Sequence, residues 1–333
     1  MSIHAIQSRG GGIRPEWANP IAAQLDMVEQ KLLASVRSDV SVASDLSMHL
    51  FSAGGKRIRP SLVLLSAMAT GSAEDRAVEM AAATELVHVA SLVHDDVVDE
   101  TRERRGVRTA HSMWGNKISV LGGDFLLAKA FSILANDGDA DIFRVISGVA
   151  VGMIESEILQ AQSEGSMEAW QANYNRIING KTAAFMSACC EVGAILGGAN
   201  DVEREALARY GTLFGLAFQI TDDILDIVGD PAQTGKDAGT DLMNGKFTMP
   251  VLLALKNPAF RLAVPPLVLE GHLTGDDTCR ITRHIIECGA VGEARDEALG
   301  CVQRAREQLS LLPRTDYKVA LEMLAESVIE RTT

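Results

Sequence analysis

The chain has 333 residues, of which 47% are hydrophobic and only 5% aromatic, so a large core must be built mainly from aliphatic side chains. Its formal net charge of −13 excludes a broadly basic surface of the kind that binds nucleic acid. The five cysteines show neither a zinc-binding spacing nor a disulfide framework, and the N-terminus carries no apolar signal segment. We therefore expect a cytoplasmic protein with no nucleic-acid partner and with peripheral membrane contact left open.

Apolar residues recur at spacings of three and four along most of the chain, which predicts amphipathic helices. Residues 1–15 are rich in glycine and predict a disordered segment, whereas residues 16–333 contain no linker and predict one helical domain. Helices are predicted, in chain order, over Ile21–Val36, Val40–Phe51, Leu62–Thr70, Ala77–Asp99, Ile118–Ala135, Ile142–Gln162, Met167–Leu196, Val202–Ile227, Pro250–Leu255, Thr278–Cys288, Val291–Leu311 and Asp316–Glu330. Alternation of period two is scarce, so the predicted class is all-α, a bundle with a site in its core.

Two of these predicted helices carry the pattern Asp-Asp-x-x-Asp, at residues 95–99 and 222–226. The first and last aspartates of each copy are four residues apart and therefore lie on one face of a helix. At a separation of about 6 Å and an effective dielectric of about 20, each carboxylate pair repels by roughly 3 kcal/mol. A hard cation such as Mg²⁺, which binds oxygen ligands together with substrate phosphates, would offset this repulsion.

Basic residues accompany the aspartate motifs at several places in the chain. They lie in GGKRIRP at 54–60, in Arg104-Arg105 after the first motif, in Gly180-Lys181-Thr182, and in the loop that contains Lys236 and Lys246. Arginine offers a planar fork that matches phosphate oxygens, and lysine offers a compact positive charge. These residues could build two anion sites.

Taken together, these motifs resemble those of the all-trans polyprenyl diphosphate synthases, most closely the medium- and long-chain members. The resemblance runs from about Ile21 to Arg331. It is carried by GGKRIRP at 54–60, ELVHVASLVHDDVVDETRERRG at 85–106, GGDFLLAKA at 122–130, EILQ at 157–160, GKTAAF at 180–185, FQITDDILD at 218–226 and GKDAGTDLMNGKFTMP at 235–250. One departure is Ser156, where glycine is frequent in that family.

The resemblance implies an isoprenoid synthase fold, a single catalytic helical bundle around a deep central cavity with both aspartate motifs at its mouth. It implies three Mg²⁺ ions per active site, with Mn²⁺ as a substitute, and a homodimer. The metal ligands that it implies are Asp95, Asp99 and Asp222, assisted by Asp96, Asp223 and Asp226.

The resemblance also implies two substrates, each with its own diphosphate site. The residues expected to bind the allylic diphosphate are Arg104, Lys181, Thr182, Gln219, Lys236 and Lys246, and those expected to bind isopentenyl diphosphate are Lys56, Arg59, His88 and Arg105, with Arg57 as a weaker candidate. Among all of these, the residues expected to act in catalysis are Asp95, Asp99, Asp222, Arg104, Lys181 and Lys236.

The helix before the first motif bears on product length. Small or medium residues precede Asp95 on it, namely Ala83, Val87, Ala90 and Ser91, and we expect them to form the wall of an apolar channel. At about 0.8 kcal/mol per buried methylene, each five-carbon unit gains roughly 3–4 kcal/mol on entering such a channel, so elongation continues until a bulky side chain blocks it. The absence of an aromatic residue at these positions favours a medium or long product.

Other functions are compatible with part of this pattern. A short-chain farnesyl or geranylgeranyl diphosphate synthase would share all the motifs. A terpene cyclase would share the first motif but would not need the GGKRIRP cations for a second diphosphate. A noncatalytic partner subunit or an acidic metal-binding scaffold would show no turnover.

Overall fold

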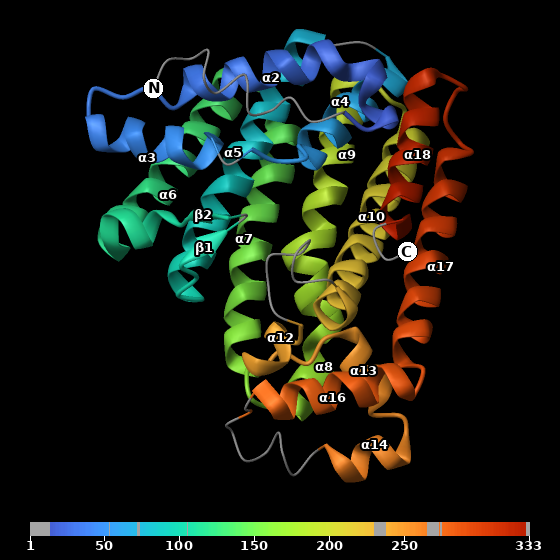
Figure 1. The fold of residues 1–333 in the computed structure, drawn as a ribbon. Helices are drawn as coiled ribbons and strands as arrows, with labels where there is room; N and C mark the ends of the chain where they lie inside the picture. The colour runs from blue at the N-terminus through green and yellow to red at the C-terminus, as the bar shows by residue number, and fades with distance from the viewer. Residues whose placement is uncertain are drawn as a thin grey trace. The chain divides into compact units, whose positions relative to one another are not determined.

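The computed structural model describes residues 14–52, 54–71, 74–104, 106–229, 238–264, 273 and 275–330. Within these ranges the chain is helical except for short connections and one two-stranded hairpin (Figure 1). The predicted all-α class is confirmed. In the hairpin, Glu103 pairs with Arg108 and Arg104 with Val107 in antiparallel register.

Most ends of the predicted helices agree with the structure to within three residues, but the helices predicted to begin at Leu62 and Ile118 begin four and eight residues earlier, and the two strands were not predicted. The elements are η1 (Glu16–Ile21), α2 (Ala22–Ser35), α3 (Ser41–Ser52), α4 (Ile58–Thr70), α5 (Glu74–Val98), β1 (Glu103–Arg104), β2 (Val107–Arg108), α6 (Ala110–Asp137), α7 (Ala140–Ser163), α8 (Met167–Ile178), η2 (Asn179–Ala183), α9 (Ala184–Gly197), α10 (Asp201–Val228), α12 (Thr240–Met243), α13 (Met249–Ala254), α14 (Pro258–Ala263), α16 (Gly275–Glu287), α17 (Ala290–Leu309) and α18 (Asp316–Glu330).

The chain divides into two compact units. Unit 1 comprises Met1–Ser147, Ala188–Leu207 and Leu311–Met323, and unit 2 comprises Gly148–Ser187, Ala208–Ser310 and Leu324–Thr333. Helices α7, α9, α10 and α18 contribute residues to both units. The predicted single catalytic domain over residues 16–333 stays a prediction, and most of the predicted disordered start, residues 1–13, lies outside the described residues.

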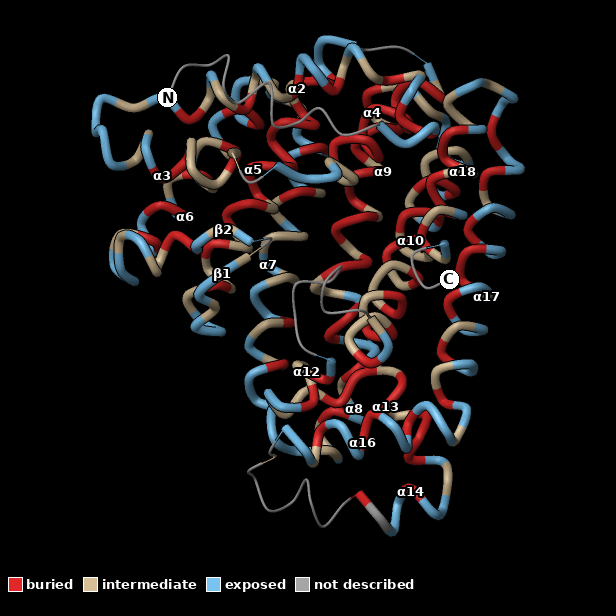
Figure 2. The backbone as a smooth tube through the Cα atoms, viewed as in Figure 1, coloured by how far each residue is buried: buried red, intermediate tan, exposed pale blue. Residues whose placement is uncertain are grey.

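Unit 1 is organised around α4 and α5, which both contribute long buried stretches. Every residue of α4 from Pro60 to Ala69 is buried, and α5 is buried over most of its length from Ala77 to Asp96 (Figure 2). Helix α5 begins with Glu74 and Asp75, whose charges favour the positive end of the helix dipole. Helices α2, α4 and α6 pack against it, so unit 1 surrounds the helix that ends in the first aspartate motif.

Helices α4 and α9 approach each other at glycines of α9 that belong to unit 1. A Cβ atom at Gly193 would lie 2.5 Å from the carbonyl oxygen of Val63, and one at Gly197 would lie 2.1 Å from Thr70 Oγ1. The crossing therefore requires glycine at both positions. On the same helix, α9, burial raises the pKa of the Cys189 thiol to about 12, so the thiol stays neutral and packs as a small apolar group.

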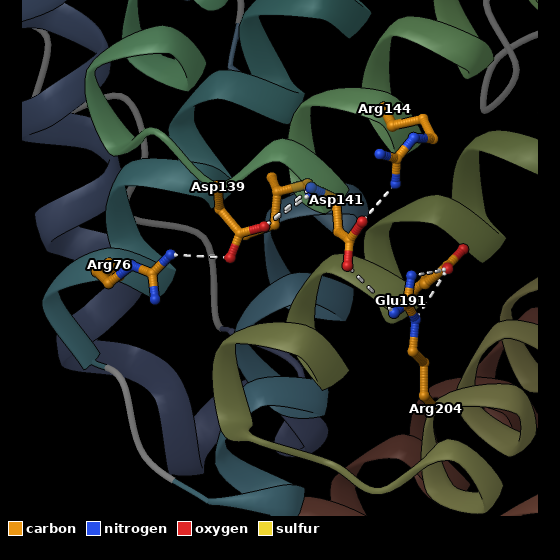
Figure 3. A network of polar contacts seen from close by, with 7 residues as sticks. Arg76, Asp139, Asp141, Arg144, Glu191 and Arg204 are labelled. Carbon is orange, nitrogen blue, oxygen red and sulfur yellow. Dashed lines mark hydrogen bonds and ion pairs between the residues drawn. The ribbon is translucent and has the colours of Figure 1, made fainter.

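A network of ion pairs connects the ends of several unit 1 helices (Figure 3). Arg76 at the start of α5 contacts Asp139 at 3.5 Å, and the Asp139 carboxylate accepts a hydrogen bond from the N–H of Asp141 at 3.0 Å at the start of α7. Asp141 also lies 4.0 Å from Arg204 in the first turn of α10, and Arg204 pairs with Glu191 of α9 at 2.7 Å. The network thus connects the first turns of α5, α7 and α10 to the middle of α9.

Helix α6 extends beyond its predicted range of Ile118–Ala135 because two helical segments join at a kink. Gly115 has φ 78° and ψ 161°, a conformation that suits glycine. By length and composition α6 is apolar enough to cross a membrane, although the sequence has no uninterrupted apolar run of that length. Its buried positions, including Gly123, Leu126, Ala130 and Ile133, recur at helical spacing and indicate a helix that packs on a core.

Unit 2 has its own apolar core, formed by α8, α10, α13, α16 and α17 together with single residues of α12, α14 and the segment before α13. Its largest contributions come from Trp170, Tyr174, Ile224, Phe247 and Phe260. The predicted helix over Thr278–Cys288 begins three residues earlier than expected, at Gly275. The short helices α12 and α14 were not predicted, because four to six residues carry too little periodicity to be recognised.

Candidate active site

The first aspartate motif lies at the carboxyl end of α5, in unit 1. Asp95 is half-buried and Asp99 is exposed, and the Asp99 N–H donates to the Asp95 carbonyl at 2.8 Å. The helical turn therefore continues through the motif beyond the end of α5 at Val98. This places Asp95 and Asp99 one turn apart on the same face, as their spacing predicts.

The middle aspartate of this motif, Asp96, differs from its neighbours because it is only 4% exposed. Arg104 donates to its Oδ1 atom through Nε at 2.9 Å and through a terminal nitrogen at 2.8 Å, since the β1–β2 hairpin brings Arg104 back onto α5. Burial raises the pKa of Asp96, and Arg104 opposes this rise. Two predicted site residues thus bind each other. Arg105 lies outside the described residues.

The GGKRIRP segment forms the connection from α3 to α4, also in unit 1. Its first residue, Gly54, has φ 69°. The Lys56 side chain is exposed, whereas Arg59 is half-buried. Arg57 has φ 51° and ψ 38° and caps the start of α4. This left-handed conformation costs a non-glycine residue about 1 kcal/mol or more. The loop is therefore held in a conformation that its side chains must stabilise.

Helix α5 carries the remaining isopentenyl diphosphate candidate, His88, and the predicted channel wall. His88 is half-buried and its carbonyl accepts from the Ser91 hydroxyl at 2.8 Å. Ala83, Val87 and Ala90 are buried and Ser91 is half-buried. The helix therefore places His88 and the wall residues within about three and a half turns of Asp95.

The second aspartate motif lies near the carboxyl end of α10, in unit 2. Asp222 and Asp226 are half-buried, whereas the middle residue, Asp223, is only 2% exposed. The Asp223 carboxylate accepts from Tyr174 Oη at 2.6 Å, from Gln219 Nε2 at 3.0 Å and from the Met249 N–H at 3.2 Å. Burial raises the pKa of Asp223 to about 7 despite these donors.

Two predicted allylic diphosphate residues are joined to this buried carboxylate. Gln219 donates to Asp223, and the Gln219 amide oxygen accepts from Thr182 Oγ1 at 2.8 Å. Unit 2 therefore fixes the orientation of both Gln219 and Thr182. In each unit, the middle aspartate of the motif binds a residue that the sequence assigned to the diphosphate site.

Lys181 and Thr182 lie in a π-helical turn, η2, between α8 and α9. The sequence predicted one regular helix over Met167–Leu196, so the turn is a correction to that prediction. Such turns widen a helix and are frequent at functional sites. Lys181 Nζ pairs with Glu157 at 2.5 Å, and a Cβ atom at Gly180 would lie 1.9 Å from Ser156 Oγ. Any larger residue would therefore strain the packing beside Ser156 in this turn.

The loop after α10 is tied to the last aspartate of the second motif. The N–H of Asp241 donates to both Asp226 carboxylate oxygens at 3.3 Å, and the N–H of Gly239 donates to the Asp226 carbonyl at 2.7 Å. Lys246 is half-buried, and its N–H donates to the Asp241 carbonyl at 2.8 Å. Lys236 lies outside the described residues.

Sequence reasoning missed four residues that organise these sites, namely Glu29, Glu85, Glu157 and Tyr174. Glu85 and Glu157 carried a signal, because each is a charged residue in an apolar helix and begins a quoted motif, ELVHVAS at 85–91 and EILQ at 157–160. Over the described ranges, no three His, Cys, Asp or Glu side chains gather to hold a metal ion. The predicted metal ligands therefore stay a prediction.

Comparison with known proteins identifies relatives over nearly the whole chain. Residues 40–265 match the family model described as polyprenyl synthetase. The chain is similar to the short chain isoprenyl diphosphate synthase of Methanothermobacter thermautotrophicus, with 37% identity over 92% of this chain and 96% of that protein. It is also similar to the octaprenyl diphosphate synthase of Escherichia coli, with 35% identity over 95% of this chain and 98% of that protein.

Among solved structures, the chain is similar to a polyprenyl synthase from Caulobacter crescentus complexed with calcium and isoprenyl diphosphate. The TM-score is 0.90 and the identity 35%, over 95% of this chain and 97% of that one. The range matched by the family model, residues 40–265, contains both aspartate motifs and the segments that carry the predicted cations.

Proposed function

Because the chain belongs to the polyprenyl synthetase family, we propose that it joins isopentenyl diphosphate head to tail to an allylic diphosphate and releases an all-trans prenyl diphosphate. The family and the prenyl-transferring enzyme class predicted from the sequence are confirmed. The main structural support is that each unit couples one aspartate motif to a diphosphate candidate, through Asp96 and Arg104 in unit 1 and through Asp223 and Gln219 in unit 2.

The proposed metal ligands are Asp95 and Asp99 in the first motif and Asp222 in the second, with three Mg²⁺ ions per active site. The chemistry of the donors fits, because these carboxylates are not buried and Mg²⁺ prefers oxygen ligands. The similar Caulobacter protein was crystallised with calcium, another cation that binds oxygen. Bound Mg²⁺ would supply positive charge to the diphosphate as it departs. Asp96 and Asp223 support the site through Arg104 and Gln219.

The allylic diphosphate is held by Arg104, Lys181, Thr182 and Gln219 in this proposal, with Lys236 and Lys246 as further candidates. These donors stabilise the leaving diphosphate as the carbon–oxygen bond breaks and its electron pair stays on the phosphate oxygen. To bind the diphosphate, Lys181 must break its ion pair with Glu157. The planar guanidinium of Arg104 can contact Asp96 and a phosphate oxygen at the same time.

Isopentenyl diphosphate is held by Lys56, Arg59 and His88, with Arg105 as a further candidate. Its double bond attacks the allylic cation, so a carbon–carbon bond forms and the positive charge moves to the isopentenyl unit. Loss of a proton to the departing diphosphate then leaves a product five carbons longer. Water must be excluded throughout, because it would trap the cation as an alcohol.

A medium or long product is supported by the small side chains along α5 and by the likeness to the octaprenyl diphosphate synthase. With Ala83, Val87, Ala90 and Ser91 as the wall, no bulky residue of α5 blocks elongation near Asp95. The second candidate is a short-chain synthase, which the 37% identity to the Methanothermobacter enzyme favours.

We further propose that the chain forms a cytoplasmic homodimer. Val151, Ile154 and Ile158 of α7 are exposed apolar residues spaced three and four apart, so they form one stripe on the helix. A second copy of the chain would cover this stripe. In the same proposal, the dimer contacts a membrane at its periphery and releases the apolar product there.

The test is product analysis with the purified chain, labelled isopentenyl diphosphate and farnesyl diphosphate, with Mg²⁺ and with a chelator. We expect Mg²⁺-dependent linear products longer than the primer. Asp95→Ala should remove nearly all activity and leave the thermal midpoint almost unchanged, while Asp75→Ala on the exposed first turn of the same helix should act as wild type. A cyclic hydrocarbon would indicate a terpene cyclase, and absence of turnover a noncatalytic partner or scaffold.

A further inference from the structure

Arg57 has an unusual backbone conformation at the point where the GGKRIRP loop becomes α4. In the described part of the chain it is one of two non-glycine residues with positive φ, together with Glu100. Its carbonyl oxygen accepts from the Ser61 N–H at 2.9 Å and from the Ser61 hydroxyl at 2.8 Å, so the residue also begins the helix. A strained position of this kind suggests a functional constraint.

The Arg57 side chain turns inward instead of toward solvent, and its guanidinium bridges two helices. Nε and one terminal nitrogen contact the Glu29 carboxylate of α2, the latter at 3.1 Å, and the other terminal nitrogen contacts Glu85 of α5 at 2.8 Å. The guanidinium carbon lies 5.9 Å from the centre of the Phe51 ring. The side chain is 10% exposed, so the loop is attached to α2, α3 and α5 at once.

This arrangement leaves Arg57 poorly suited to bind a substrate directly. Three of its five N–H donors already point to carboxylates, and Glu85, at 5% exposed, has little access to water. Burial alone would lower the pKa of Arg57, but the charges of Glu85 and Glu29 outweigh burial and raise it. Arg57 is therefore a fixed cation whose positive charge is already balanced within unit 1.

We propose that Arg57 is a positioning residue, held by Glu29 and Glu85, that sets the GGKRIRP loop so that its neighbours can grip the second diphosphate. Lys56 precedes it and Arg59 follows two residues later, so the conformation of Arg57 decides where both cations point. Glu85 lies three residues before His88 on α5 and therefore on the same side of the helix. One side chain thus links the loop cations to the helix that carries His88. This inference rests on the proposed function.

The direct test measures the KM for each substrate separately in Glu29→Gln, Arg57→Met and Arg57→Lys. Because misplacing a binding group weakens binding without changing its chemistry, we expect the KM for isopentenyl diphosphate to rise about tenfold in Arg57→Met and about threefold in Glu29→Gln. The KM for the allylic primer should change less than about twofold, and Arg57→Lys should recover part of the loss. Glu79→Gln is the matched control, since it breaks another α2–α5 ion pair, with Lys31, without touching the loop.

A second arm separates positioning from general stability. Arg57→Met leaves Glu85 buried without its cation, so we expect a lower thermal midpoint, and adding Glu85→Gln should restore most of the midpoint. Positioning requires that the KM for isopentenyl diphosphate stays high in this double variant. The inference is overturned if the KM for isopentenyl diphosphate recovers together with the thermal midpoint, or if the KM values for both substrates rise equally. It is also overturned if Glu29→Gln leaves the KM for isopentenyl diphosphate unchanged while Arg57→Met raises it, because Arg57 would then be a direct ligand. If the wild-type chain does not consume isopentenyl diphosphate, the proposed function itself fails.

Discussion

Gly180 is the position where one added methyl group should test the geometry of the allylic site most directly. It belongs to the η2 turn, immediately before Lys181 and Thr182. In Gly180→Ala the new Cβ would lie 1.9 Å from Ser156 Oγ, 3.0 Å from Ser156 Cβ and 3.1 Å from the Gly152 carbonyl oxygen. The hydroxyl can rotate away, but the other two contacts remain tight and require the backbone of η2 or α7 to move.

The expected magnitude follows from these contacts. Overpacking of this kind costs about 1–3 kcal/mol, and the gain from replacing glycine with alanine in a helix offsets up to about 1 kcal/mol of it. We therefore expect the free energy of unfolding to fall by about 1–2 kcal/mol and the thermal midpoint by a few degrees. Since Lys181 and Thr182 share the displaced turn, kcat/KM for the primer should fall on the order of tenfold.

Denaturant titration and initial rates on a double-mutant cycle provide the measurement. Ser156→Gly removes the two shortest contacts, so Ser156→Gly with Gly180→Ala should be as stable as Ser156→Gly alone to within about 0.5 kcal/mol. If Gly180→Ala matches the wild type in stability and rate, or if Ser156→Gly brings no recovery, the close packing of α7 against η2 is refuted.

Three further outcomes follow from the structure. Ala90→Phe should shorten the product, measured by chromatography, and an unchanged length distribution would reject the placement of the channel wall on α5. Tyr174→Phe removes the 2.6 Å hydrogen bond to the buried Asp223 carboxylate, so the free energy of unfolding should fall by about 1.5–3 kcal/mol. Denaturant titration measures this loss, and a loss below about 0.5 kcal/mol would contradict the hydrogen bond. The hydrogen bond from Arg76 lowers the pKa of Asp137, so this pair stabilises the fold above the unfolded pKa of about 4 and loses its effect as the pH falls through the lowered value. Arg76→Gln should therefore lower the thermal midpoint at pH 7, and this loss should shrink as the pH is reduced below about 4; a loss that does not change with pH would exclude an electrostatic origin.

Long periodic helices could be predicted from the sequence because each apolar face is repeated over many turns. The prediction of Asp316–Glu330 matches α18, and Val202–Ile227 differs from α10 by one residue at each end. Features that depend on a few residues were missed. The β1–β2 hairpin, the kink at Gly115 and the η2 turn each interrupt or connect helices without a periodic signal of their own.

The site could be predicted as a set of residues but not as a set of contacts. The sequence shows the two aspartate motifs as equivalent copies, yet the burial of Asp223 depends on Tyr174, which lies 49 residues away in the chain. In the same way, the sequence cannot show that Arg57 points inward, because this depends on its left-handed backbone and on Glu29 and Glu85 in two other helices. Such long-range partners are fixed only by the tertiary fold.

The π-helical turn allows the chain to change its length at one place. Its hydrogen bonds run from i to i+5, so the turn contains one residue more than an ordinary α-helical turn. Deleting a single residue within Asn179–Ala183 would therefore allow an ordinary α-helix to form with about the same total rotation across the segment. Phe185 and Met186, which are both fully buried, would keep their places in the core. The widened backbone that carries Lys181 and Thr182 would be lost, so the extra residue changes the candidate site and leaves the packing of the later helix unchanged.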